Sequence, residues 1–231
     1  VQGGHLLGPV QGAGRVQADA TLTRVVHGSK KGVGLSQGLF PSYSEIDPFL
    51  MAAAGIDTAI RGLIAIGVPL DTIAILDNFC WCSSDEPGRL GQLKRAARGC
   101  YEVATAFGTP FISGKDSMFN DFSGYDAENN RVKISVPPTL LISSIGIHPD
   151  VAKAVSLDAK IAGDLVYVVG ETSEELGGSE YFAHLGYAGN TVPGLDTATA
   201  RERYGRMTEA ISRGLVASAF PVSHGGLGTA L

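Results

Sequence analysis

The feature that most constrains the fold is the helical pattern of residues 87–107. Its apolar residues recur at three- and four-residue steps, as they do along one face of an amphipathic helix. They are Leu90, Leu93, Ala97, Cys100, Tyr101, Ala104 and Phe107. Gly108 follows and ends the pattern. Short apolar runs flank this helix at residues 72–76 and 111–113, and each predicts a short buried strand.

Further elements are expected on both sides of this unit. Asp47 and Pro48 predict a helix start, with the aspartate as cap and the proline at the first helical position. Strands are expected at residues 16–23 and 32–36, and one or two more within residues 132–147. A buried strand is expected at residues 165–169, a helix at 199–219 and a polar loop at 114–131. Strands and helices that mix without strict alternation predict an α+β or mixed α/β fold.

Composition limits the class of protein. With 231 residues, 44% of them hydrophobic and 18% charged, the chain can form a core and one or two domains. We place a boundary at a shift in composition, giving domains of residues 1–150 and 151–231. The net charge of -5 argues against general binding to nucleic acid or to an anionic membrane. No secretory signal or membrane-spanning run is recognisable.

The three cysteines, Cys80, Cys82 and Cys100, lack the spacing of a disulfide framework or a structural zinc site. We interpret them as reduced cytosolic thiols. The five histidines are scattered without metal-ligand spacing. The last seven residues resemble the opening turn of a helix, from which we expect a chain truncated at its C-terminus.

The segment Ser113-Gly114-Lys115-Asp116-Ser117 has the composition of a phosphate-binding loop. Glycine allows close approach of the backbone, lysine supplies a positive charge and aspartate can hold magnesium. The Walker A spacing is absent. A polar turn after a strand is the alternative interpretation.

Two other carboxylates are candidates. Asp77 follows the apolar run 72–76 and precedes Trp81, the single tryptophan, and ligand groups are frequent at the carboxyl ends of strands. An Asp-Asn turn is the alternative. Asp19 lies within a largely apolar segment, where a buried carboxylate needs a partner or a metal. Alternatively, Asp19 points to solvent.

Together these segments resemble phosphoribosylformylglycinamidine synthase, in the second half of its synthetase subunit. The resemblance extends from about Val10 to the last residue. It rests on VQADATLTR, the Asp47-Pro48 start, LDNFCW, FGTPFISGKDS, the proline pair before TLLISSIG, and ETSEELGGSEY. A more distant similarity is to aminoimidazole ribonucleotide synthetase and its superfamily. The resemblance implies an N-type α/β domain followed by a partial C-type domain.

The family makes formylglycinamidine ribonucleotide from formylglycinamide ribonucleotide, ATP and glutamine-derived ammonia. The resemblance therefore implies a cytoplasmic ligase of purine biosynthesis with ATP and Mg²⁺ as cofactors. It implies three partners: the first half of the same subunit, a glutaminase subunit and a small accessory subunit. The family's catalytic histidine lies in the first half. The resemblance thus places no catalytic residue in this segment, and we expect the segment to be inactive alone.

The resemblance also assigns residues. Asp77 and Gly114 match nucleotide contacts, and Ser117 matches a substrate contact. Lys115 stands where many members have a magnesium-binding asparagine, a role that a charged lysine cannot take, and direct contact with a phosphate is the alternative. By its residue type, Asp116 is a further candidate for the metal.

Asp19 matches a metal ligand of an auxiliary nucleotide site found in the large single-chain form. Other ligands of that site are replaced here by Thr58, Gly62 and Pro221, whereas Ser223 is kept. A degraded auxiliary site is therefore expected.

Two alternatives remain. The first is a non-catalytic half that only buttresses its partner. The second is a superfamily kinase that acts on thiamine phosphate or selenide, against which LDNFCW and GKDS argue.

Overall fold

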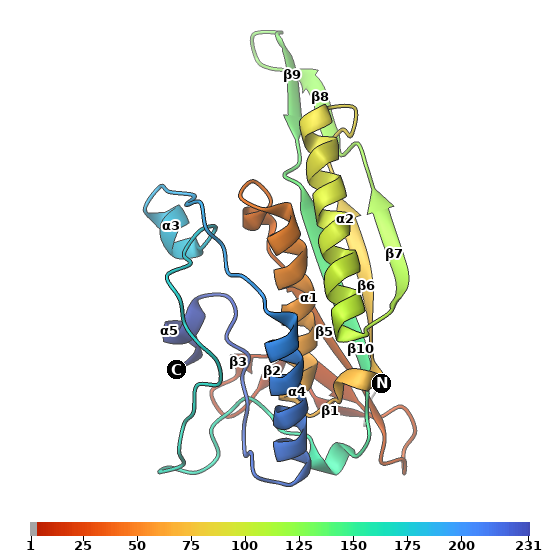
Figure 1. Cartoon of the computed structure of the whole chain (residues 1–231), viewed down its shortest axis with the longest axis vertical. Helices are drawn as coiled ribbons and strands as arrows, with labels where there is room; N and C mark the ends of the chain where they lie inside the picture. The colour runs from red at the N-terminus through yellow and green to blue at the C-terminus, as the bar shows by residue number, and fades with distance from the viewer. Residues whose placement is uncertain (1–3) are drawn as a thin grey trace.

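The computed structural model describes residues 4–231, so residues 1–3 of the predicted first domain lie outside the described chain. Its centre is a six-stranded sheet in the order β1-β4-β5-β10-β6-β7 (Figure 1). The strands are His5–Leu7 (β1), Ala20–Thr23 (β4), Gly32–Leu39 (β5), Thr139–His148 (β10), Ile73–Cys80 (β6) and Phe111–Ser117 (β7). Each neighbouring pair is antiparallel except β6 and β7, which run parallel.

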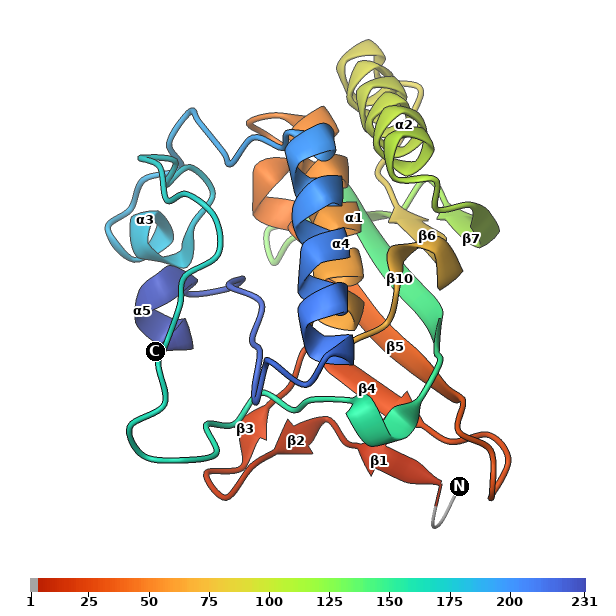
Figure 2. The same cartoon turned by 60° about the horizontal axis from the view of Figure 1, so that its bottom comes forward.

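Helices cover one face of this sheet. α1 (Pro48–Ala65) lies on β5 and β10, α2 (Pro87–Phe107) lies beside α1, and α4 (Thr197–Ser212) packs on both helices (Figure 2). α1 begins as predicted, because the Asp47 carboxylate accepts hydrogen bonds from the backbone N–H groups of Phe49 and Leu50. α1 is long and apolar enough to cross a membrane by length and composition, but 78% of it is buried inside the protein.

The core lies between the sheet and the helices. It contains Ile56, Ile60 and Leu63 of α1, Leu140 and Ile142 of β10, and Phe107 of α2, all at most 2% exposed. On β10 the buried residues alternate with half-buried ones, as expected for a strand with one covered face. The mixed α/β fold class is therefore confirmed.

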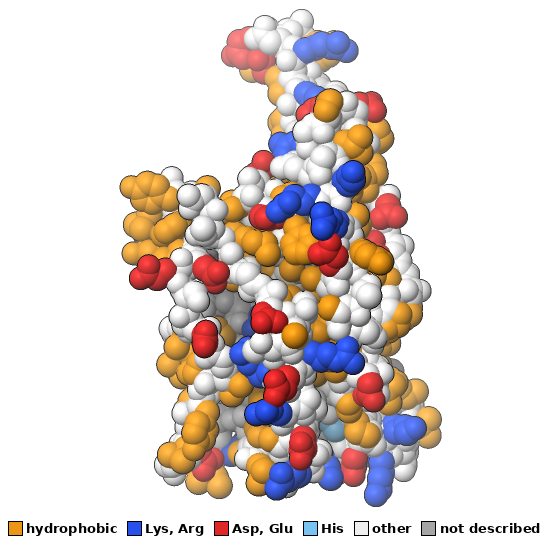
Figure 3. All heavy atoms as spheres, in the orientation of Figure 1, with side chains coloured by type: hydrophobic (Ala, Val, Ile, Leu, Met, Phe, Trp, Pro, Cys, Tyr) orange, Lys and Arg blue, Asp and Glu red, His pale blue; other side chains and the backbone are white. Residues whose placement is uncertain are grey.

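Shorter elements complete the described chain. β2 (Val10–Gln11) pairs with β3 (Val16–Gln17), and β8 (Asp121–Tyr125) pairs with β9 (Arg131–Ser135) in a hairpin that extends beyond α2 (Figure 1). In the space-filling view this hairpin is the narrow projection at the top (Figure 3). The short helices are Pro41–Tyr43 (η1), Leu70–Thr72 (η2), Val151–Lys153 (η3), Glu180–His184 (α3) and Gly226–Ala230 (α5).

Several sequence predictions about the elements are wrong. The strand expected at residues 16–23 is divided between β3 and β4, which belong to different sheets. Residues 114–131 are not one polar loop, because β7 continues to Ser117 and β8 begins at Asp121. Residues 165–169 form no strand and are exposed, since no described strand pairs with them. The helix predicted at 199–219 spans Thr197–Ser212.

The buried face of α2 also differs from the prediction. Tyr101 is 72% exposed and Leu90 is 50% exposed, whereas Ala96, Gly99 and Val103 are buried. Small residues of α2 face α1 here. No side chain fits at Gly99, because its Cβ would lie 2.7 Å from the Phe49 carbonyl oxygen.

Candidate functional site

The predicted nucleotide residues lie on the parallel strands β6 and β7. Asp77 is opposite Gly114, Phe79 is opposite Asp116, and Cys80 is opposite Ser117. The apolar run 72–76 predicts a strand that ends just before Asp77. That prediction is wrong, because β6 continues to Cys80. The glycine loop is likewise the outer edge strand of the sheet rather than a turn.

Asp77 and Gly114 are in direct contact. A Cβ built on Gly114 would lie 2.5 Å from Asp77 Oδ1 and 3.0 Å from its Cγ, so the carboxylate occupies the space that the glycine leaves free. Burial, together with the negative charge of Asp116, raises the pKa of the Asp77 carboxyl. Gly114 is thus the residue that allows a half-buried carboxylate to lie against β7.

Strand alternation divides the site residues between two faces of the sheet. Residues paired across parallel strands point to the same side, so Asp77, Gly114 and Asp116 share the helix-covered face. Lys115 and Ser117 share the other face with Asn78 and Cys80. The structure therefore brings Asp77 and Ser117 to neighbouring strands at one edge of the sheet, but on opposite faces.

The side chains next to Asp77 include possible ligands for magnesium. Mg²⁺ in phosphate sites is commonly held by one or two carboxylates together with phosphate oxygens. Asp77 and Asp116 provide two carboxylates on one face of neighbouring strands, which is the type of donor that such a site uses. Lys115 lies on the other face and offers no oxygen, so it does not fit the ligand role. Within residues 4–231 no group of three or more His, Cys, Asp or Glu could hold a metal by itself.

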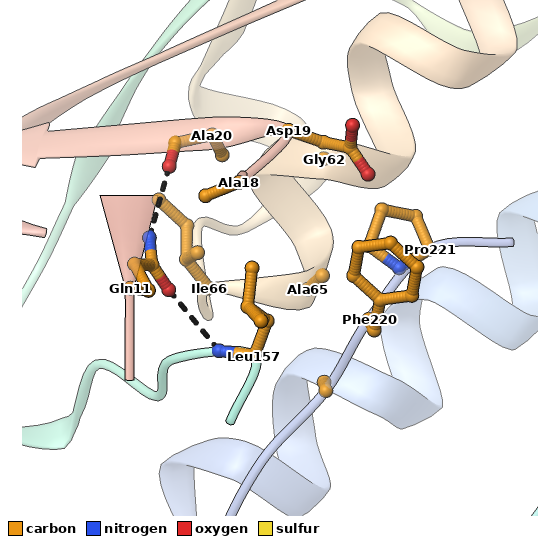
Figure 4. Close-up of a pocket in the computed structure, with 11 residues that line it drawn as sticks. Gln11, Ala18, Asp19, Ala20, Gly62, Ala65, Ile66, Leu157, Phe220 and Pro221 are labelled. Carbon is orange, nitrogen blue, oxygen red and sulfur yellow. Dashed lines mark hydrogen bonds between the residues drawn. The ribbon is translucent and has the colours of Figure 1, made fainter. Parts of the chain in front are cut away.

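Asp19 lies elsewhere on the sheet. It follows β3 and precedes β4, with β5 and β10 between β4 and the site strand β6. Its carboxylate faces a small cavity beside Gly62 and Pro221 (Figure 4). Burial raises the pKa of Asp19, while the positive charges of Arg61 and His224 oppose this change. Asp19 Oδ2 is buried without a hydrogen-bond partner in the described chain.

This cavity is too small for a nucleotide. Its volume of about 10 Å³ is close to the space for one water molecule. Phe220 and Pro221 line it, and the next residue, Val222, accepts a hydrogen bond of 2.6 Å from Arg61 through its carbonyl oxygen. Arg61 also donates to Asp57 at 2.7 Å and to Thr58 at 3.0 Å. Arg61 of α1 therefore holds the segment that follows Pro221 close to this helix.

Sequence reasoning missed the residues that organise the end of β7. Asn120 donates to the Ser117 carbonyl oxygen at 2.7 Å, and Phe119 has a left-handed backbone with φ of 58°. A polar residue after GKDS was visible in the sequence, but no sequence signal predicts positive φ at a phenylalanine.

Comparison with known proteins shows what this chain is similar to. The chain is 32% identical over 225 residues to the phosphoribosylformylglycinamidine synthase subunit PurL of Anaeromyxobacter sp.. It is also 32% identical over 210 residues to the PurL subunit of Caulobacter vibrioides. These matches cover 95% and 90% of this chain. The chain is a homologue of part of PurL.

The match covers only part of each relative. The chain spans 28% of the Anaeromyxobacter PurL subunit and 27% of the Caulobacter one. A continuous match of that length in this chain includes β6 and β7, and therefore all the candidate residues from Asp77 to Ser117. A scan against protein-family models finds no match.

Solved structures with a similar arrangement include Thermotoga maritima PurL complexed with AMPPCP. The TM-score is 0.49 at 18% identity, covering 59% of this chain and 21% of that chain. The same protein complexed with FGAR gives a TM-score of 0.48 at 17% identity, covering 60% and 20%. Thiamine monophosphate kinase from Aquifex aeolicus gives a TM-score of 0.41 at 12% identity, covering 58% and 40%.

Proposed function

We propose that this chain supplies one side of the ATP and substrate site of a phosphoribosylformylglycinamidine synthase. The observation that carries the proposal is the identity of 32% to PurL over 95% of the chain, a stretch that includes the Asp77–Gly114 contact. The proposed whole enzyme converts formylglycinamide ribonucleotide, ATP and glutamine-derived ammonia to the amidine, ADP and phosphate. It belongs in the cytoplasm with the other enzymes of purine synthesis.

In the proposed reaction ATP transfers its γ-phosphoryl group to the amide oxygen of the substrate. Ammonia then attacks the carbon, and the oxygen leaves as phosphate. When bound, Mg²⁺ would offset the charge of the transferred phosphoryl group, with Asp77 and Asp116 as its protein ligands. Gly114 leaves space for the Asp77 carboxylate against β7, and Ser117 would offer a hydroxyl to the substrate from the other face of the same strand pair. ATP and substrate would therefore meet around the exposed edge of β7, where the two faces of the sheet adjoin.

The open face of the sheet supports the proposal that the first half of the same subunit is a partner. Leu39 lies opposite Leu141, and Leu35 lies opposite Ile145, so the open face carries two apolar pairs across β5 and β10, with one polar pair between them. Leu35 is 51% exposed and Leu39 is 38% exposed. An exposed apolar sheet face of this kind is typical of a protein interface. The glutaminase and the small accessory subunit stay proposals from the resemblance.

A second candidate function is a non-catalytic half that only buttresses its partner. The cavity beside Asp19 favours a non-catalytic role for the auxiliary site alone, because a space of about 10 Å³ admits no nucleotide. The β6–β7 site is not closed in this way, since β7 is an exposed edge strand. We therefore propose a structural role near Asp19 and a binding role at β7.

The test is amidine formation by the full-length protein that contains these residues. We expect Asp77→Asn and Ser117→Ala each to lower kcat/KM by about 100-fold, because each removes a contact to a reacting ligand. Asp71→Asn is the matched control, since Asp71 is exposed in the short helix just before β6. Normal turnover in both site variants would refute the assigned roles, and an inactive wild-type protein would refute the function.

A further inference from the structure

The turn after β7 is held by one side chain, that of Asn120. Its Nδ2 atom donates to the Ser117 carbonyl oxygen at 2.7 Å and approaches Cys80 Sγ at 3.5 Å. Its backbone N–H donates to the Trp81 carbonyl oxygen at 2.9 Å, and its own carbonyl oxygen accepts from the Val136 N–H at 3.2 Å. Asn120 therefore joins the ends of β6 and β7 to the segment that leads into β10.

The Ser117 carbonyl oxygen is fixed from two directions. It accepts the Asn120 side-chain bond and also a bond of 2.8 Å from the Trp81 N–H. Trp81 is fully buried, and its indole N–H donates to the Arg89 carbonyl oxygen at the start of α2. The peptide group of Ser117 is thereby connected to the rigid core, although the strand that carries it is an exposed edge.

The backbone between Ser117 and Asn120 is strained. Phe119 has φ of 58°, and a left-handed conformation at a residue with a Cβ costs about 1–2 kcal/mol. Its ring is 54% exposed, so apolar burial does not account for the strain. Strain of this kind persists where surrounding bonds determine the conformation, and it is frequent at binding sites. The bonds around the turn are those of Asn120 and one of 2.8 Å from the Asp121 N–H to the Phe119 carbonyl oxygen.

We propose that Asn120 is a positioning residue for the substrate contact of Ser117. By fixing the Ser117 carbonyl and the strained Phe119 turn, it holds the Ser117 hydroxyl in the orientation that binds formylglycinamide ribonucleotide. We call the hydrogen bonds of Asn120 to Ser117, Trp81 and Val136 the Asn120 clamp. The nucleotide contacts Asp77 and Gly114 lie on the other face of the sheet and do not depend on this clamp. The inference rests on the proposed function, because that function supplies the role of Ser117.

The first arm of the test measures kinetics in the full-length protein. Asn120→Ala should raise the KM for formylglycinamide ribonucleotide about tenfold or more while the KM for ATP changes less than about twofold, since small displacements of a positioned group are costly. Asn120→Asp should behave in the same way, because aspartate keeps the shape and loses the amide donor. The control is Asn130→Ala, which removes a comparable amide bond of 3.0 Å to Asp126 at the hairpin tip.

An unchanged substrate KM in Asn120→Ala would overturn the proposal. So would equal increases of both KM values, or the same increase in Asn130→Ala, because either result indicates general loosening of the strand.

The second arm needs no catalysis and is done on the 231-residue chain. Amide hydrogen exchange of Trp81, whose N–H bonds to the Ser117 carbonyl, should become about tenfold faster in Asn120→Ala and stay unchanged in Asn130→Ala. Unchanged exchange at Trp81 in the Asn120 variant would overturn the clamp itself. An inactive wild-type enzyme with faster Trp81 exchange in the variant would instead reject the proposed function and leave the clamp standing.

Discussion

At the scale of single residues, the site depends on the glycine at position 114, which has no side chain, as much as on the side chains around it. The Asp77 carboxylate lies where a Cβ of residue 114 would be, and Asp116 follows on the same face of β7. The composition of GKDS predicts residue types for phosphate chemistry, and that assignment stays a prediction. The sequence alone could not show that Lys115 and Asp116 point to opposite faces, because that follows from β7 being a strand rather than a turn.

One prediction concerns Gly114 directly. In Gly114→Ala the new methyl group would displace the Asp77 carboxylate, which can rotate away because it is the end of a side chain. We expect the KM for ATP in the full-length protein to rise about tenfold, with a stability loss of about 1 kcal/mol or less. ATP kinetics and thermal unfolding measure these two effects.

The matched control is Gly91→Ala in α2, where an added Cβ meets nothing within 4 Å. There alanine should stabilise the helix by up to about 1 kcal/mol. An unchanged KM for ATP in Gly114→Ala would show that the position of Asp77 does not matter for the nucleotide.

At the scale of elements, the sequence predicted the two long helices well because their ends carry local signals. Asp47 caps α1, and Gly108 ends α2 in the left-handed conformation with φ of 73°. Strand ends were predicted less well. β6 continues through Asp77 and Asn78 because its neighbours β10 and β7 offer hydrogen bonds there. Such pairing is non-local and leaves no pattern in the sequence.

His148 joins two elements and makes their contact depend on pH. Its Nε2–H donates to the Ile66 carbonyl oxygen after α1 at 3.1 Å, and its Nδ1 accepts from the Asp150 N–H at 3.2 Å. Burial lowers the pKa of His148 below its usual 6.5, against a smaller opposing effect of the bond to Ile66. As pH falls below about 6.5, His148 takes up a proton in the unfolded chain before it does so in the folded one. The free energy of unfolding that this residue contributes above that pH is therefore lost progressively.

Urea unfolding between about pH 7.5 and pH 5 measures this effect. We expect the free energy of unfolding to fall over that range and His148→Gln to flatten part of the fall. His27→Gln, in the exposed loop between β4 and β5, is the control and should keep the wild-type slope. A variant slope equal to that of the wild type would show that His148 is not the titrating group.

At the scale of the whole molecule, residues 151–231 are less regular than residues 4–150. The described helix α4 packs on α1 and α2, while residues 165–169 lie exposed without strand partners. The run Leu-Val-Tyr-Val-Val has strong strand propensity, which is why the sequence predicted a buried strand. The division into domains at residue 150 stays a prediction.

The exposed run should make the 231-residue chain self-associate. Val166 is 77% exposed and Val168 is 53% exposed, and unpaired strand-forming segments associate through their backbone. We expect the sedimentation coefficient to rise with protein concentration and the double variant Val166→Lys/Val168→Lys to reduce that rise. The matched control is Val25→Lys/Val26→Lys in the exposed loop before β5. A chain that stays monomeric at every concentration, or equal effects of the two variants, would contradict this expectation.

The strand order has a consequence for biosynthesis. β10 lies between β5 and β6, yet it is the last of the six sheet strands to leave the ribosome. Until then, β5 and β6 each present an unpaired inner edge and α1 lacks part of the surface on which it packs. The nascent chain therefore passes through a stage in which the place of β10 between β5 and β6 is empty. During that stage its unpaired strand edges make aggregation easiest and the need for a chaperone greatest.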